Sequence, residues 1–99
     1  MDENKITEGC KEVATAIIAR AALDYMEYKR DLYRLGFEDQ TDEKVKEEIN
    51  RLEVELKLLD KFFKTSIYMS LMNISSEWVI ETLDKEFEKW RIEHDKLLL

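Results

Sequence analysis

The sequence predicts an all-α protein, an antiparallel three-helix bundle with a short extra helix between the second and third long helices. Proline is absent and glycine occurs twice in 99 residues, so the turns of a many-stranded sheet have few residues to form them. Apolar residues recur at helical intervals along most of the chain. With 44% hydrophobic and 39% charged residues, residues 1–99 suit a single domain with one modest core.

The first long helix is predicted over residues 10–35. Gly36 follows the last apolar residue, and we expect it to end the helix in the left-handed conformation, with Phe37 folding back on the last turn. Gly9 suggests a frayed start or a bend, so residues 2–8 are expected to be only partly ordered. The apolar stripe of this helix consists of residues 10, 14, 17, 18, 21, 25, 28, 32 and 35.

The second helix is predicted over residues 42–64, with Thr41 as its N-cap and acidic residues in its first turn. Its apolar positions follow a 4-3-4-3-4 spacing without interruption, which is the clearest helical pattern in the chain. These positions are Val45, Ile49, Leu52, Leu56, Leu59 and Phe63.

Two further helices are predicted over residues 66–72 and 76–96. Thr65 and Ser66 compete for backbone hydrogen bonds and separate the short helix from the second one. Ser75 is the expected N-cap of the last helix, with Ile74 and Val79 at the positions of a hydrophobic staple. The last apolar stripe consists of Ile80, Leu83, Phe87, Trp90, His94 and Leu97.

The long helices carry more apolar surface than a three-helix monomer buries, which predicts a homo-oligomer, with a dimer favoured. Residues 13–28 are apolar around most of the helix, and Val54, Leu58 and Phe62 lie beside the main stripe of the second helix. The alternative is that residues 66–72 fold back and cover this surplus. At ~1.5 Å per residue the longest helix spans roughly 39 Å, so an elongated shape is expected.

The composition argues against several classes of partner. A formal net charge of −7 disfavours direct binding to nucleic acid and to anionic membranes. The first residues lack the basic and apolar regions of a signal peptide, and the nearly uncharged run 13–23 is shorter than a membrane span. Cys10 is the only cysteine, so it has no partner for an intramolecular disulfide. These observations predict a cytoplasmic protein.

No reactive constellation is evident, so the sequence predicts neither an enzyme nor a metal or cofactor site. One histidine and one cysteine do not supply a structural zinc site. His94 lacks the Glu-x-x-His spacing of di-iron bundles, and no glycine-rich phosphate loop is present. Cys10 and His94 are better explained as helix-stripe residues than as a nucleophile and its base.

Two groups of side chains are candidate binding residues. Tyr68, Met72 and Trp78 lie around the second break in the helical pattern, and they either bind a protein partner or seal the end of the bundle.

Arg20, Asp24, Tyr25 and Tyr28 form the second candidate, a pocket for an anionic ligand. Arg20 would face a nucleotide phosphate and one of the tyrosines would stack on the base. The simpler interpretation is a solvated ion pair between Arg20 and Asp24, four residues apart on one helix.

Residues 61–80, KFFKTSIYMSLMNISSEWVI, resemble a motif in small phage- and prophage-encoded proteins of unassigned function. That motif combines a paired Phe, a hydroxyl or basic residue, an aromatic-rich helical turn, a short acidic turn, an aromatic residue and two aliphatic residues. Residues 17–25, IIARAALDY, look like the first-helix pattern of the same proteins. The similarity covers residues 15–35 and 58–84 but departs at the turn, where Asn73, Ser75 and Ser76 replace the usual Asp/Gly chemistry. It implies a phage origin and no enzymatic activity.

Together these inferences predict a non-enzymatic, phage-type protein that binds and modulates a host or phage protein in the host cytoplasm. One form would be an inhibitor of a host defence nuclease, of the anti-CRISPR or DNA-mimic type, although bases among the acids weaken a phosphate-like stripe. The alternatives are a module that sequesters a nucleotide at an oligomer interface and a structural dimerising adaptor.

Overall fold

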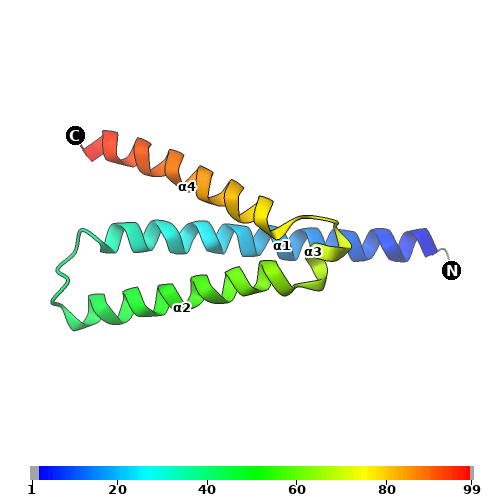
Figure 1. The fold of residues 1–99 in the computed structure, drawn as a ribbon, viewed down its shortest axis with the longest axis horizontal. Helices are drawn as coiled ribbons and strands as arrows, with labels where there is room; N and C mark the ends of the chain where they lie inside the picture. Colours follow the sequence, from blue (N-terminus) through cyan, green and yellow to red (C-terminus); the bar gives the residue numbers. More distant parts are fainter. Residues whose placement is uncertain (1–2, 99) are drawn as a thin grey trace.

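A computed structural model describes residues 3–98, with side chains described over residues 9–97. This part of the chain is all-α and contains no strand (Figure 1), which confirms the predicted class. The last three helices lie within two residues of their predicted bounds. The helices are α1 (Glu3–Leu35), α2 (Glu43–Thr65), α3 (Ile67–Leu71) and α4 (Ser76–Leu98).

The helices form an elongated molecule that is more open than the predicted bundle. α2 runs back beside α1 in the opposite direction, α3 lies against α1, and α4 starts beside α3 and diverges from α1 (Figure 1). The principal extents are 59 × 29 × 19 Å and the radius of gyration is 17.0 Å, so the expected elongation is confirmed. The widening space between α1 and α4 is bridged by long side chains.

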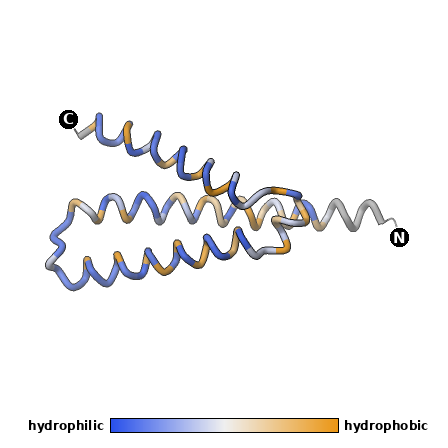
Figure 2. The backbone as a smooth tube through the Cα atoms, viewed as in Figure 1, coloured by the Kyte–Doolittle hydropathy of each residue, from blue (hydrophilic) through white to orange (hydrophobic). Residues whose placement is uncertain are grey.

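The core lies where α1, the end of α2, α3 and the start of α4 meet. Hydrophobic residues concentrate at this junction, whereas the loop between α1 and α2 is hydrophilic (Figure 2). Tyr25 and Phe63 meet edge to face with ring centroids 6.2 Å apart. Six of the eight buried hydrophobic residues belong to the predicted stripes; Met69 and Val79 join them. The buried residues are Ala14, Ile18, Ala21, Tyr25, Leu52, Phe63, Met69 and Val79.

Both ends of the predicted stripes lie outside this core. Cys10 and Leu97 are exposed, because the N-terminal segment of α1 extends past α3 and α4 diverges toward its C-terminus (Figure 1). The predicted start of the first helix at residue 10 is wrong, since α1 already runs from Glu3 through Gly9. Residue 2 lies outside the described residues. An exposed glycine lowers the stability of a helix by only about 1 kcal/mol, which a 33-residue helix tolerates.

The end of α1 differs from the predicted left-handed cap. Gly36 does not adopt a positive φ, and its N–H donates to the carbonyl oxygens of Leu32 and Tyr33 at 3.1 and 3.2 Å. The following N–H groups of Phe37 and Glu38 each donate three residues back, so the helix tightens into a final turn. The prediction that Phe37 folds back is confirmed, because its ring meets Tyr33 edge to face at 5.2 Å.

The N-cap of α2 is Asp42 and not Thr41. The Asp42 carboxylate accepts a hydrogen bond from the N–H of Lys44 at 2.8 Å, and the residue is extended as an N-cap should be. Thr41 instead donates its N–H and its hydroxyl to the carboxylate of Asp39 at 2.9 and 2.7 Å. These bonds hold the pKa of the Asp39 carboxyl below its usual range. Asp39 therefore orders the polar loop, and Asp42 caps the helix that follows it.

Two polar residues, Ser66 and Asn73, set the ends of α3. The N–H of Ser66 ends α2 by donating to Phe62, while its hydroxyl caps α3 by accepting from Tyr68 at 3.1 Å. Asn73 ends α3 in the left-handed region with φ 54°, where asparagine is tolerated better than most residues. The N–H groups of Asn73 and Ile74 then donate to Ser70 and Met69, both at 3.0 Å, in the pattern of a Schellman motif.

We expect the Phe63→Ala variant to lose about 3–5 kcal/mol of unfolding free energy, because Phe63 is only 1% exposed and its removal leaves a cavity at the junction of the helices. Urea denaturation followed by circular dichroism measures this loss. Val54→Ala is the control, since Val54 is exposed on α2. Equal losses in the two variants would contradict the placement of the core.

Candidate functional site

An apolar groove lies between α1 and the start of α4. The hydroxyl of Ser75 accepts a hydrogen bond from the N–H of Trp78 at 3.3 Å, which confirms Ser75 as the cap and places Trp78 in the first turn of α4. The Trp78 side chain is 61% exposed beside a shallow cavity of about 220 Å³. The cavity is lined by Ile18, Ala19, Ala22, Ile74, Trp78, Val79, Thr82 and Leu83.

The other two predicted partner-binding residues lie deeper. Tyr68 lies on α3 and Met72 directly follows it, and both side chains are half-buried and pack against the core. The sulfur of Met72 lies 3.6 Å from the hydroxyl of Thr15 on α1. Of the three residues, Trp78 alone is exposed, whereas the half-buried Tyr68 and Met72 help to cover the core.

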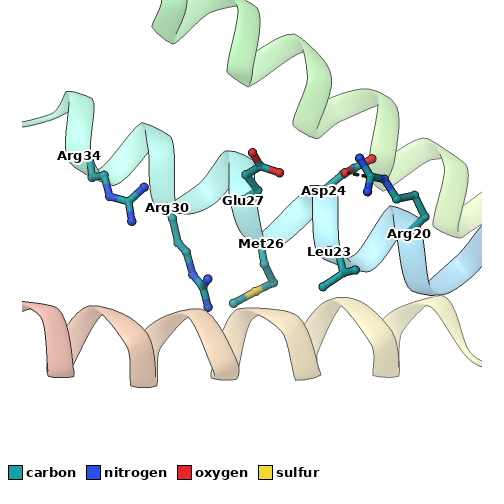
Figure 3. Close-up of a pocket in the computed structure, with 7 residues that line it drawn as sticks. All are labelled: Arg20, Leu23, Asp24, Met26, Glu27, Arg30 and Arg34. Atoms are coloured by element: carbon teal, nitrogen blue, oxygen red, sulfur yellow. Dashed lines mark ion pairs between the residues drawn. The ribbon is translucent and has the colours of Figure 1, made fainter.

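The structure does not bring the predicted ligand pocket together. Arg20 and Asp24 form an ion pair at 3.2 Å on the outer surface of α1, as the simpler interpretation expects. Tyr25 is buried in the core, and neither Tyr25 nor Tyr28 lines the cavity of about 450 Å³ beside that ion pair. Figure 3 shows this cavity as a strip of α1 between α2 and α4. Its lining residues are Arg20, Leu23, Asp24, Met26, Glu27, Arg30 and Arg34.

Tyr25 instead ties α1 to α4. Its hydroxyl donates a hydrogen bond to Asp84 at 2.8 Å, and the ammonium group of Lys29 reaches the same carboxylate oxygen at 2.9 Å. Burial and the neighbouring carboxylate of Asp84 both raise the pKa of the Tyr25 phenol. Asp84 thus accepts bonds from two α1 side chains one helical turn apart.

A second α1–α4 contact, which the sequence analysis did not anticipate, stacks cationic side chains on aromatic rings. The guanidinium carbons of Arg30 and Arg34 each lie 5.4 Å from the centroid of the Trp90 ring. Tyr33 meets Trp90 edge to face at 5.7 Å, and the His94 ring stacks on Trp90 at 4.8 Å. These residues bridge the space where the two helices diverge.

The signal for this contact was present in the sequence as matched spacing. Arg30 and Arg34 lie four residues apart on α1, and Trp90 and His94 have the same spacing on α4. Tyr33 also donates a hydrogen bond to Asp95, which raises the pKa of the Tyr33 phenol. A search for apolar residues at helical spacing leaves out arginine, because arginine is usually solvated. It therefore does not predict that guanidinium groups lie over aromatic rings.

In the part of the chain that the structure describes, no three His, Cys, Asp or Glu side chains gather in a way that would hold a metal ion. Cys10 and His94 belong to segments at opposite ends of the molecule (Figure 1). None of the described helices combines the length and the apolar character that crossing a membrane requires.

Comparison with protein-family models, with curated proteins and with solved structures found no match to this chain. The resemblance to phage-encoded proteins therefore stays a prediction.

We expect the stability of the protein to fall as the pH rises above about 10, because the unfolded chain ionises its tyrosines there while native Tyr25 resists ionisation. Below that pH the contribution of Tyr25 is complete; it is lost as the pH approaches the raised native pKa. Tyr25→Phe is expected to flatten this decline, measured as unfolding free energy at several values from pH 9 to pH 11.5. Identical slopes in the two proteins would contradict the role of Tyr25.

We expect Trp90→Ala to loosen the C-terminal half of α4 and to leave α1 and α2 unaffected, because the variant loses the contacts with Arg30, Arg34 and His94. Amide hydrogen exchange over residues 87–98 should speed up by about tenfold or more. Ile92→Ala, at an exposed position of the same helix, is the matched control. Uniform acceleration along the whole chain would show that Trp90 acts on global stability instead.

Proposed function

We propose that this chain is a non-enzymatic binding protein that docks an amphipathic helix of a partner protein in the groove between α1 and α4. The observation that carries the proposal is the exposure of Trp78, 61% accessible beside a groove lined almost wholly by apolar side chains. An exposed tryptophan at the rim of an apolar depression has the character of an interface hot spot.

The shape of the groove supports a helical ligand. It lies between two helices, and its walls alternate small residues, Ala19 and Ala22, with the larger Ile18 and Leu83. Small side chains allow the backbone of a third helix to approach, while the larger ones contact its apolar face. Thr82 is the single polar residue in the lining, so the apolar face of an incoming helix would supply most of the contact.

The surface charges of the helices support apolar docking over mimicry of a phosphate backbone. Many surface acids pair with a base one helical turn away on the same helix, as Glu48 does with Arg51 and Glu88 with Arg91. These arginines lower the pKa of both glutamates. Acids neutralised in this way offer a weak substitute for the continuous negative charge of nucleic acid.

The origin and identity of the partner follow from the resemblance alone. A phage-type protein would use this groove against a host or phage protein, and inhibition of a host defence nuclease is one form of that activity. The nucleotide-sequestering alternative has little support, because the ring of Tyr25 lies in the core and Tyr28, the other tyrosine expected to stack on a base, does not line the cavity beside Arg20.

Selection of helical peptides from a display library on the immobilised protein tests the proposal. We expect the selected peptides to carry an apolar face, and Trp78→Ala to weaken their binding by about 30-fold or more, as measured by fluorescence anisotropy. Leu97→Ala is the control, since Leu97 is also exposed on α4 but distant from the groove.

The dependence of binding on salt separates apolar docking from charge mimicry. Apolar docking predicts an affinity for the selected peptide that changes little with ionic strength. Selection of acidic or basic peptides without an apolar face, or equal binding by the wild type and Trp78→Ala, would refute the proposal.

A further inference from the structure

A second surface, which adjoins the Trp78 groove at Ala19, runs along the outer side of α1. α2 lies on one side of α1 and α4 on the other, and neither covers the strip between them (Figure 3). Val13 and Leu23 are 56% and 65% exposed on this strip, and Ala16 and Ala19 are exposed between them. α3 therefore covers only part of the apolar surplus on α1.

The strip continues into a shallow groove between α1 and α2. Leu58 of α2 is exposed there, beside Ile17 of α1. This groove has a volume of about 310 Å³ and lies beside the Arg20–Asp24 ion pair. Exposed apolar side chains that continue over two helices are typical of an interaction surface.

Four charged residues on the outer strip of α1 are placed so that a second copy of the helix, lying antiparallel, would bring an opposite charge to each of them. Reading from the N-terminus, the strip carries Glu12, Arg20, Glu27 and Arg34. Arg20 and Glu27 lie symmetrically about position 23.5, and Glu12 and Arg34 about position 23, so both pairs of opposite charges have centres within half a residue of Leu23. Arg30, which also lines the strip, would face Ala16 of the second copy. A parallel pairing of two such helices would instead place each charge opposite its own kind.

We infer that two copies of this chain associate through the outer strips of their α1 helices, antiparallel and about a two-fold axis close to Leu23. Each Arg20 then faces Glu27 of the second copy, each Glu12 faces Arg34, and the two Leu23 side chains meet at the axis. The exposed Ala16 and Ala19 let the helix backbones approach closely.

The charged side chains on the strip are accessible to a second copy. Glu27 forms no ion pair with any described residue. Arg20 and Arg34 pair with Asp24 and Asp31 on their own helix, and Arg34 also lies over Trp90, yet 76% and 55% of the two arginine side chains remain exposed. Residues 12–34 would form a contact about 33 Å long at ~1.5 Å per residue.

Charge reversal tests both the surface and the orientation. We expect Arg20→Glu and Glu27→Arg each to raise the dissociation constant of the dimer by about tenfold or more, because each creates two like-charged contacts across the axis. The double variant R20E/E27R restores the pairing and should return the constant to within about threefold of the wild type. Sedimentation equilibrium measures dimerisation, and circular dichroism checks that each variant folds.

Cysteine cross-linking checks the orientation independently. In a Cys10→Ser background, Leu23→Cys should form a disulfide-linked dimer on mild oxidation, because the two residues at position 23 meet at the axis. Wild-type Cys10 should not cross-link, since the antiparallel arrangement separates the two thiols. A monomer at all concentrations, efficient linkage through Cys10, or a dimer that is unaffected by the single reversals would each overturn the inference. Trp78→Ala should leave dimerisation unchanged, which separates this result from the peptide-binding experiment.

Discussion

The junction where Phe63 lies against α1 is the constraint on which the other contacts depend. Phe63 brings the end of α2 to the buried ring of Tyr25, and Met69 and Val79 extend the same apolar contact to α3 and α4. Here the connections between α2, α3 and α4 are short and tightly capped. The helices then leave the junction in their own directions, and the long arms of the molecule rely on weaker contacts.

The polar contacts between α1 and α4 follow from that geometry. Since α4 diverges from α1, small apolar side chains cannot span the space, and long side chains take over. Near the junction Tyr25 and Lys29 share Asp84, and farther out Arg30 and Arg34 lie on the ring of Trp90. As the distance between α1 and α4 increases, apolar packing is thus replaced by hydrogen bonds and then by cationic side chains stacked on an aromatic ring. The groove beside Trp78 lies where this separation begins, between close packing and open solvent.

The sequence predicted the elements of this fold better than their ends or their arrangement. Unbroken spacing on α2 identified Leu52 and Phe63 as core residues, because a helical stripe depends only on local geometry. Asp42 and not Thr41 is the N-cap because the hydroxyl of Thr41 bonds to Asp39 in the loop. The spacing of apolar residues does not reveal such a bond. The buried position of Tyr25 was part of the predicted stripe, yet its use as a ligand-stacking residue conflicted with that position. The cation–aromatic contacts of α4 depend on an interhelical angle that no local pattern encodes.

The way the chain is connected has a kinetic consequence. α1 and α2 are neighbours in sequence, joined by a short polar loop, so a helical hairpin can form through local contacts before distant segments meet. α3 and α4 follow in order along the chain and join a surface that already exists. With no proline in the sequence, no slow prolyl isomerisation delays these steps. A newly synthesised chain is therefore expected to reach this fold quickly once α4 has been made.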